Sequence, residues 1–590
     1  MRRLNPFQLP EHVVLSLEVQ AHLPNNKREQ IRFEVLVRHI FERFLNNELM
    51  SSDGESKRAI MLAYAIAWFG MIVALFLTPV YHQPIRRSFW LQVGDHYSFV
   101  MYAMVVMGVV TVYEWDLLFP GLLDVFVLSV LPIKDRKLFL ARVLALVIFF
   151  ALIVLGTNCL STIFLPLLSD EPHLFLHIFA HGTAVVMGGC FTAALFLSIQ
   201  GLLLNLLGQR MFRRITPLLQ GASITILLTV LFLYPVLSRF LQPLLNSGNS
   251  FARWFPPFWF LGIYERLLAG SSTLPIFKEL ARSGCWATLF TIAIAMITYP
   301  LAYRRRVRQL IEGAGAMSTR SWITYPINKI LHATVLHLPA RRAVFHFISQ
   351  TLLRTQKHRV LLAMYAGLGI ALALAEMVVL TIVRGHVRVS FLSDGIRSAI
   401  PVLLFWTVAG LQTALTAPID RRGRWIFRVI IGQPSLEHLN GAKIWVAVWG
   451  IAVSAATLAA LHGVAPRDLQ SPIALATQLV VAVGLCLLLT DCLFLKTLAI
   501  PFTELHKTAL TDMPLVVVRY FVVFPIMVLM IVQHEPWFEM SVVHLVQILV
   551  AIVAGHLCLR WWYGQRVHEM RAGSDFEDDE ELFQQLGLRD

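Results

Sequence analysis

Long apolar runs, separated by short polar or turn-forming breaks, extend along almost the whole chain. Each run has roughly the 20 residues that an α-helix needs to cross the hydrocarbon core of a bilayer. The pattern therefore predicts about twelve transmembrane helices in two consecutive groups of six. The expected spans are 59–80, 97–115, 139–165, 174–206, 217–240 and 285–303, followed by 360–383, 397–417, 442–462, 472–500, 514–533 and 542–563.

The composition agrees with this pattern and excludes other classes of protein. Hydrophobic residues make up 57% of the 590 residues and charged residues only 15%, with a mean hydropathy of +0.66. An ordinary soluble domain has about 25% charged residues. We therefore expect an all-α, polytopic membrane protein, and not a soluble, disordered, collagen-like or disulfide-rich secreted chain. The six cysteines lie in apolar runs and form no CxxC pair, so we expect no zinc motif, no redox motif and no cofactor.

The basic excess of the chain is concentrated in one segment. Residues 303–359 contain eleven Lys or Arg and one acidic residue, Glu312, in a chain of formal net charge +14. A basic linker between hydrophobic blocks is typical of a cytoplasmic segment beside anionic membrane lipid, and no folded basic module for nucleic acid is visible. Because an even number of spans precedes and follows the linker, we expect both termini in the cytoplasm and the chain in the plasma (inner) membrane.

Weak but ordered matches between the two groups of spans predict a tandem repeat. Thr216-Pro217-Leu218 opens the fifth span as Met513-Pro514-Leu515 opens the eleventh. The end of the sixth span, with Tyr303, Arg306 and Val307, lines up with the end of the twelfth, with Tyr563, Arg566 and Val567. Both halves would run in the same direction, because each begins and ends in the cytoplasm. The predicted segments are a cytoplasmic part with an amphipathic helix (1–58), the first half (59–303), a basic cytoplasmic linker (304–359), the second half (360–563) and an acidic cytoplasmic tail (564–590).

Two segments outside the spans have one apolar and one charged helical face. In residues 31–45 an apolar stripe that includes Leu36 and Phe44 lies opposite charged residues such as Arg38. The stretch His337–Arg359 repeats this pattern more loosely. We expect both segments to be amphipathic helices in the membrane interface, before spans one and seven. The alternative is a helix that packs onto a soluble domain, and the sequence contains no such domain.

The connections between spans two and three and between spans eight and nine share a plan. Each combines a short helical stretch, a proline and a charged turn that leads into the next span. The candidate residues of these loops are Glu114, Asp116, Pro132, Lys134, Asp135 and Arg136 in the first half and Arg424, Pro434 and Glu437 in the second.

The entry into the third span, Leu131-Pro132-Ile133 followed by a charged turn and Leu138-Phe139, resembles the permease subunits of ATP-binding-cassette exporters of the six-span type. The resemblance implies an amphipathic connecting helix before span one. It also implies that the two loops contain coupling helices that dock on an ATPase, and that re-entrant helices before span six form an extracytoplasmic gate. The residues that match this gate are Trp254, Pro256, Pro257 and Trp259. The second half departs from the pattern, because it lacks an equivalent Trp- and Pro-rich stretch.

The leading expectation is a permease component without enzymatic activity of its own. The chain has no GxxxxGK[ST] phosphate-binding loop after a strand and no hydrophilic block large enough for an ATPase domain. Its partners would be cytoplasmic ATP-binding-cassette ATPase subunits, which drive alternating access, and membrane lipid. Two alternatives stay open: an ion-coupled secondary transporter that uses intramembrane carboxylates, and a membrane-embedded lipid-modifying enzyme with histidines near its active site.

Ionisable residues inside spans are candidate functional residues, because charge at membrane depth is costly. Glu376 is expected deep in span seven, without a local partner. Asp491 in span ten lies five residues before Lys496, with which it could form a structural pair. Either carboxylate could serve an ion-coupled transporter.

A stripe of histidines marks the start of span four. His173, His177 and His181 are spaced by four residues and therefore share one helical face. They could form a polar stripe or, with ligands from a second helix, bind a metal or haem. His544 and His556 also lie in a span, but nothing in the sequence marks them as such ligands.

Overall fold

The computed structural model is almost entirely helical in the residues that it describes. Eleven of these helices are long and apolar enough to cross a membrane. The chain is therefore a multi-pass helical membrane protein, as its hydropathy predicts. The described residues are 25–45, 88–129, 133–168, 173–207, 209–246, 250–311, 331–383, 386–416, 436–463, 467–495, 501–502 and 518–573.

Each of the eleven helices overlaps one expected span, and the expected span 59–80 lies outside the described residues. Several helices continue beyond their apolar runs. The helix Pro275–Ile311, for example, has 37 residues and a length of about 55 Å. The spanning helices are α4 (Phe89–Tyr113), α6 (Asp135–Leu168), α7 (Leu174–Leu206), α8 (Gln209–Phe232), α13 (Pro275–Ile311), α16 (Gln356–Met377), α17 (Ser393–Thr416), α19 (Leu436–His462), α20 (Pro472–Leu493), α22 (Phe524–Glu539, preceded by the π-helical turn Arg519–Val523) and α23 (Val542–Gly573).

Shorter elements connect the spans. A two-stranded hairpin, which the sequence did not predict, joins α16 to α17. The short elements are α2 (Asn25–Leu45), α5 (Leu122–Ser129), α9 (Tyr234–Arg239), α10 (Leu241–Asn246), α11 (Ser250–Trp254), α12 (Pro256–Ala269), α15 (Pro339–Arg354), the 3₁₀ turns Gly270–Ser272 and Arg467–Gln470, and the strands β1 (Val378–Val383) and β2 (His386–Phe391).

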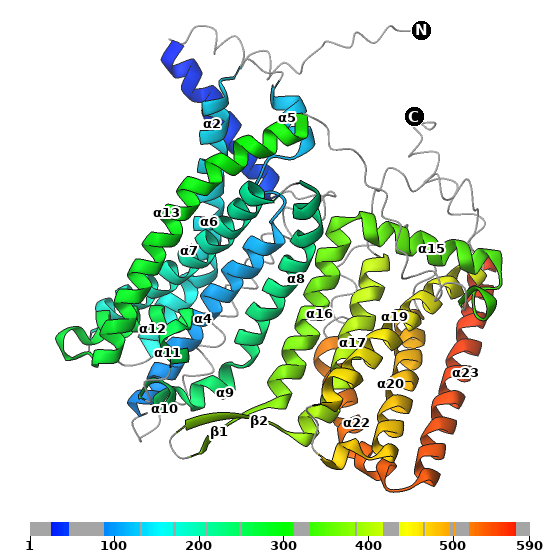
Figure 1. Ribbon diagram of the computed structural model, residues 1–590. Helices are drawn as coiled ribbons and strands as arrows, with labels where there is room; N and C mark the ends of the chain where they lie inside the picture. Colours follow the sequence, from blue (N-terminus) through cyan, green and yellow to red (C-terminus); the bar gives the residue numbers. More distant parts are fainter. Residues whose placement is uncertain are drawn as a thin grey trace, which may run out of the picture. The chain divides into compact units, whose positions relative to one another are not determined.

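The chain forms two compact units (Figure 1). Unit 1 contains residues 1–209 and 249–314, and unit 2 contains residues 210–248 and 315–590. The helices α8, α9 and α10, which precede the linker in sequence, are thus grouped with unit 2. Gly367 explains part of this grouping, because a Cβ atom there would lie only 3.0 Å from Thr225 Oγ1 of α8. A small residue at this point lets α8 and α16 approach closely.

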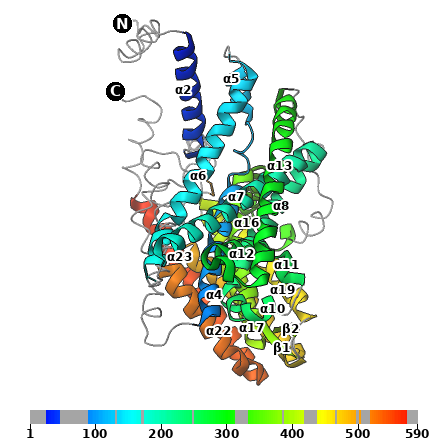
Figure 2. The same ribbon diagram turned by 90° about the vertical axis from the view of Figure 1, so that its left-hand side faces the viewer.

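In unit 1, α7 packs against α4, α6, α12 and α13. The core between these helices contains Val100 and Met104 of α4, Ala184 of α7, and Phe260 of α12. Gly262 leaves no room for a side chain between α12 and α13, because a Cβ atom would meet the α13 backbone at 2.8 Å. Both views show α2, α5 and the last turns of α13 together at one end of this unit (Figure 2).

The predicted amphipathic helix forms as α2, and its apolar stripe packs on α6. Leu36, Val37 and Ile40 are buried, and the ring of Phe44 stacks on that of Phe149 with 5.3 Å between the centroids. The stripe that we expected in the membrane interface is thus covered by a helix of the same unit, because aromatic and aliphatic side chains of α6 match it.

In unit 2, α15 packs along α19, and it forms the helix expected before span seven. Its residues Val344, Phe345 and Ile348 join a core with α17, α19 and α20. The indole nitrogen Nε1 of Trp445 donates a hydrogen bond to the hydroxyl of Ser349 at 2.8 Å. The apolar face of α15 is therefore fixed to the unit along its length.

Span seven ends earlier than its hydropathy suggested. The helix stops at Met377, and the β-branched stretch that follows forms β1, paired antiparallel with β2 from Val378↔Phe391 to Val383↔His386. Glu376 therefore lies exposed in the last turn of α16, and the expectation of a carboxylate deep in the span was wrong. Apolar composition alone could not distinguish a helical continuation from a strand.

Candidate functional site

The loop after α4 is fixed to the first turns of α6 by one arginine. Arg142 donates from Nη2 to the carbonyl oxygens of Leu117 and Phe119, both at 2.7 Å, and its Nη1 lies 3.3 Å from Oδ2 of Asp124. The same carboxylate oxygen accepts the N–H of Gly121 at 3.0 Å. The guanidinium and the carboxylate are both buried. Because the planar guanidinium has five donors in fixed directions, it holds this loop in one geometry.

Two further helices hold the same loop. Gln200 of α7 donates from Nε2 to the carbonyl oxygen of Trp115 at 2.7 Å, and the hydroxyl of Tyr299 on α13 donates to the carbonyl oxygen of Leu118 at 2.8 Å. The indole of Trp115 is fully buried. These bonds go to backbone atoms, so any displacement of the loop acts on α6, α7 and α13 together.

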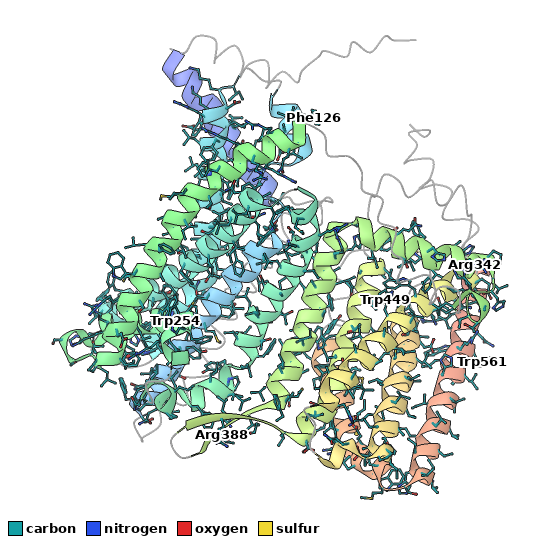
Figure 3. All side chains as sticks on the ribbon, in the orientation of Figure 1. Phe126, Trp254, Arg342, Arg388, Trp449 and Trp561 are labelled. Atoms are coloured by element: carbon teal, nitrogen blue, oxygen red, sulfur yellow. The ribbon has the colours of Figure 1, made fainter. Side chains whose placement is uncertain are left out.

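Beyond this anchored loop, α5 presents an exposed apolar tip. Phe126 and Val127 are 56% and 63% exposed (Figure 3). Large apolar side chains exposed together are typical of a contact with lipid or with another protein. Among the expected loop residues, Glu114 is buried at the end of α4, Asp116, Lys134, Asp135 and Arg136 are exposed, and Pro132 lies outside the described residues.

The corresponding loop of the second half is described only at its end. Glu437, in the first turn of α19, forms an ion pair with Arg341 of α15. This pair joins the first turn of α19 to α15. Arg424 and Pro434 lie outside the described residues.

The Trp- and Pro-rich segment forms α11 and α12 ahead of α13. Trp254 ends α11 and is exposed, and Pro256 and Pro257 begin α12, where a missing N–H is tolerated. Trp259 donates from Nε1 to the carbonyl oxygen of Arg253 at 2.6 Å. With 14 residues, α12 has a length of about 21 Å, less than the roughly 30 Å of a hydrocarbon core. It is therefore a short helix that packs inside unit 1 without the length to span a bilayer.

Asp491 is held by partners from two other helices. Its Oδ1 lies 3.2 Å from Nζ of Lys443 on α19, and its Oδ2 lies 2.6 Å from Nδ1 of His556 on α23. The ammonium of Lys443 also lies 3.5 Å from the ring centroid of Tyr563. Lys496, the local partner considered from sequence, lies outside the described residues. The carboxylate thus ties three helices of unit 2 together.

The histidine stripe meets a carboxylate that comes from α12. Nδ1 of His96 on α4 lies 2.7 Å from Oε1 of Glu265, and both side chains are buried. The ring of His96 stacks on Tyr264 at 4.1 Å between centroids and meets His177 edge-on at 5.3 Å. His181 lies 5.6 Å from Tyr264. We refer to His96, His177, His181, Tyr264 and Glu265 as the histidine cluster.

The histidines along α7 become more buried from the start of the helix inward. His173 is exposed at the start of α7, whereas His177 and His181 are fully buried. Neither ring nitrogen of His181 has a hydrogen-bond partner within the described part of the chain. Among the residues described, no group of three or more His, Cys, Asp or Glu side chains has the arrangement to hold a metal ion. The stripe thus lies against the His96–Glu265 pair through the ring of His177.

The two residues at the centre of the cluster, His96 and Glu265, were missed from sequence. A signal existed, because His96 directly precedes an expected span and Glu265 follows the apolar run Phe258–Ile263. The two are separated by 169 positions, however, and only the packing of α12 on α4 brings them together.

Unit 2 contains a largely buried group of one guanidinium and its carboxylates at the start of α17. Arg397 lies with Nη2 at 2.8 Å from Oε2 of Glu539 on α22, and with Nη1 at 3.5 Å from Oδ1 of the more exposed Asp394. Glu535, one turn before Glu539, is buried, and its Oε1 has no hydrogen-bond partner within the described part of the chain. One guanidinium therefore faces two largely buried carboxylates.

Comparison with protein-family models, with curated proteins and with solved structures finds no match for this chain. Its function is therefore inferred from the anchored loop, the short helices and the buried acid–base groups described above.

Proposed function

We propose that the chain is the transmembrane permease component of an ATP-driven exporter, whose alternating access is driven by separate cytoplasmic ATPase subunits. The observation that carries this proposal is the anchored loop after α4. Arg142, Gln200 and Tyr299 fix its backbone to three membrane helices, while α5 offers an exposed apolar tip. A push on α5 would move α6, α7 and α13 together, which is what a coupling element in alternating access requires.

The order of elements gives further support. An amphipathic helix, α2, precedes the first expected span, and short helices, α11 and α12, precede α13. This order matches the parts of the exporter permeases that the sequence resembles. The proposal places α5, the basic linker and both termini in the cytoplasm of a cell whose plasma (inner) membrane holds the chain, and α12 near the opposite surface.

The proposal includes a parallel tandem repeat of two six-span halves. In the first half, His96 near the start of α4 meets Glu265 on the segment before the sixth span. In the second half, Arg397 near the start of α17 meets Glu539, the last residue of the eleventh span α22. In each half, the start of the second span thus contacts a carboxylate that lies shortly before the sixth span of that half. This correspondence supports a duplication more directly than the short sequence matches do.

The two alternative functions have less support. Ion-coupled transport by Glu376 or Asp491 is disfavoured because Glu376 is exposed at a helix end and Asp491 is paired with Lys443 and His556. A lipid-modifying enzyme would need a substrate site that reaches the histidines, and His177 and His181 are buried among side chains of unit 1.

Co-purification with an ATPase tests the proposal. The full chain would be tagged, expressed in its native membrane background and isolated, and bound cassette ATPases would be identified by mass spectrometry and ATP hydrolysis. The double substitution Phe126→Asp and Val127→Asp should weaken this association by about tenfold or more, because two carboxylates would have to lose water in an apolar contact.

A matched control is Val389→Asp. Val389 lies on β2 and is 61% exposed, close to the 63% of Val127, so general effects of an added surface carboxylate are the same. The control should retain the ATPase. An ATPase that stays bound after both changes in α5, or a wild-type complex without any ATPase, contradicts the proposal.

A further inference from the structure

The histidine cluster has a chemistry that a purely mechanical permease does not use. Two acceptor atoms at 2.7 Å require a hydrogen between them, so one proton is shared by Nδ1 of His96 and Oε1 of Glu265. With that proton alone the pair has a net charge of −1. A second proton, on Nε2 of His96, makes the pair neutral overall. Histidine is the side chain whose charge changes most readily near neutral pH.

We propose that the histidine cluster is a proton-binding site of unit 1, and that His173 and His177 connect it to the surface. Loading forms an N–H bond at Nε2 of His96, and the proton comes from water at the exposed end of the stripe. Each transfer between imidazoles breaks one N–H bond and forms another, and no electron is transferred. Release to water reverses these steps. The proposal does not depend on an ATPase partner.

The placement of the rings favours such a path. His173 and His177 are one helical turn apart, about 6 Å along the axis, and the ring of His177 meets that of His96 at 5.3 Å. His181 lies one turn further in, fully buried, with both nitrogens unpartnered among the described residues. Buried polar atoms normally have a partner, so the nitrogens of His181 leave hydrogen-bonding capacity beside the cluster that no described residue uses.

Titratable and charged neighbours of the cluster lie on α4, α12 and α13. On α4 the buried Asp95 and Tyr97 flank His96, and on α12 the neighbour Arg266 is exposed. Around the cluster, α6 faces α7 with uncharged residues such as Val154 and Thr162. The α13 side chains buried toward α12 are the apolar Phe277, Leu280 and Ala281, whereas Lys278, Glu279 and Arg282 of α13 are exposed.

Proton binding at the His96–Glu265 pair affects the contact between two helices, because Glu265 lies on α12 and His96 lies on α4. A net charge inside a membrane is costly, so the loaded, neutral pair suits a closed contact between α12 and α4. The unloaded pair, with its net charge of −1, favours access of water. Proton binding would therefore bias how tightly α12 is held to α4.

Infrared difference spectroscopy on the full-length protein in lipid vesicles tests the site. Spectra recorded at about pH 5 and pH 8, the range in which histidine titrates, should differ by the bands of one histidine–carboxylate pair. These bands should be absent in Glu265→Gln and in His96→Gln. They should persist in Glu279→Gln, a matched control that removes an exposed carboxylate on α13.

Kinetics and labelling make the test decisive. After a pH jump, His177→Gln should keep the amplitude of these bands but slow their appearance several-fold; an unchanged rate overturns the path. If substitutions in the cluster reduce the amount of folded protein, ¹³C-glutamate labelling of the wild-type chain identifies carboxylate bands without any substitution there. Difference spectra that are identical in the wild type and Glu265→Gln, or wild-type spectra without a pH-dependent buried carboxylate band, overturn the site.

Discussion

Two of the buried carboxylate contacts, one from each unit, use different bases. In unit 1 a single carboxylate, Glu265, meets the imidazole of His96. In unit 2 the guanidinium of Arg397 meets Glu539, with Glu535 one turn away. A guanidinium keeps its charge at all physiological pH values, whereas an imidazole gains or loses its charge near neutrality. The chemistry of the base, and not the distance between the partners, therefore decides whether a buried pair is a fixed clamp or a site that can switch.

The largest effect is expected for Arg397→Met. The substitution leaves Glu535 and Glu539 without their buried cation, which should cost about 3–5 kcal/mol of unfolding free energy. The measurement is thermal unfolding in detergent, together with the yield of monodisperse protein. Arg388→Met, at an exposed arginine on β2, is the control and should behave as wild type. Equal unfolding temperatures for both variants would contradict a stabilising role of Arg397 beside Glu535 and Glu539.

The ion pair of Lys443 and Asp491 in unit 2 offers a second test, in which a second substitution should restore part of the lost stability. Lys443→Met leaves Asp491 with His556 alone. Because His556 still pairs with the carboxylate, we expect a loss of about 1.5–3 kcal/mol, the value of one hydrogen bond to a charged group. Adding Asp491→Leu should recover most of this loss, since an apolar pair of similar volume replaces the charges. Thermal unfolding of the two single variants and the double variant measures the coupling. Strictly additive losses would show that Lys443 and Asp491 act independently.

Glu265→Gln should be milder than either change in unit 2. The amide oxygen can still accept the N–H of His96, so we expect a loss of about 1 kcal/mol, the value of one hydrogen bond. The same thermal unfolding measurement checks this value, with Glu279→Gln as the exposed control. A loss as large as that of Arg397→Met would mean that His96 and Glu265 form a fixed ion pair.

The smallest effect concerns a histidine pair of unit 2 that could add its own pH dependence. Nε2 of His332 and Nε2 of His346 are 2.8 Å apart. Partial burial, followed by the positive charge of His332 and Arg342, lowers the pKa of His346. The folded state then binds a proton less tightly than the unfolded state, in which the pKa of histidine is about 6.5. The stability linked to this pair is complete above that pH and decreases as the pH falls below it.

His346→Gln should therefore flatten part of the decrease in unfolding temperature on acidification. His337→Gln, at an exposed histidine whose Nδ1 lies 3.2 Å from the carbonyl oxygen of Thr334, is the matched control and should keep the wild-type slope. If His346→Gln leaves the slope of unfolding temperature against pH unchanged, the pH dependence of stability does not come from this histidine pair, and the histidine cluster of unit 1 becomes its expected source.

Hydropathy determined the class of the protein and most of its helices. Eleven expected spans have a helical counterpart in the described residues, because a bilayer requires long apolar helices whose backbone hydrogen bonds are satisfied within each segment. The amphipathic stripe of α2 was likewise readable, since it depends on local periodicity. The end of α16 was not, because Val378–Val383 is apolar enough for a helix and β-branched enough for a strand.

Only the tertiary structure decided which polar residues meet. The sequence marked His177 and Asp491, but it could not supply Glu265 for the first cluster or Lys443 and His556 for the second, because these partners lie on other helices. It also could not show that Arg142 holds the backbone of the loop after α4. Periodicity is a property of one helix at a time, whereas a buried polar contact depends on how two helices pack, and that packing brings together residues far apart in the chain.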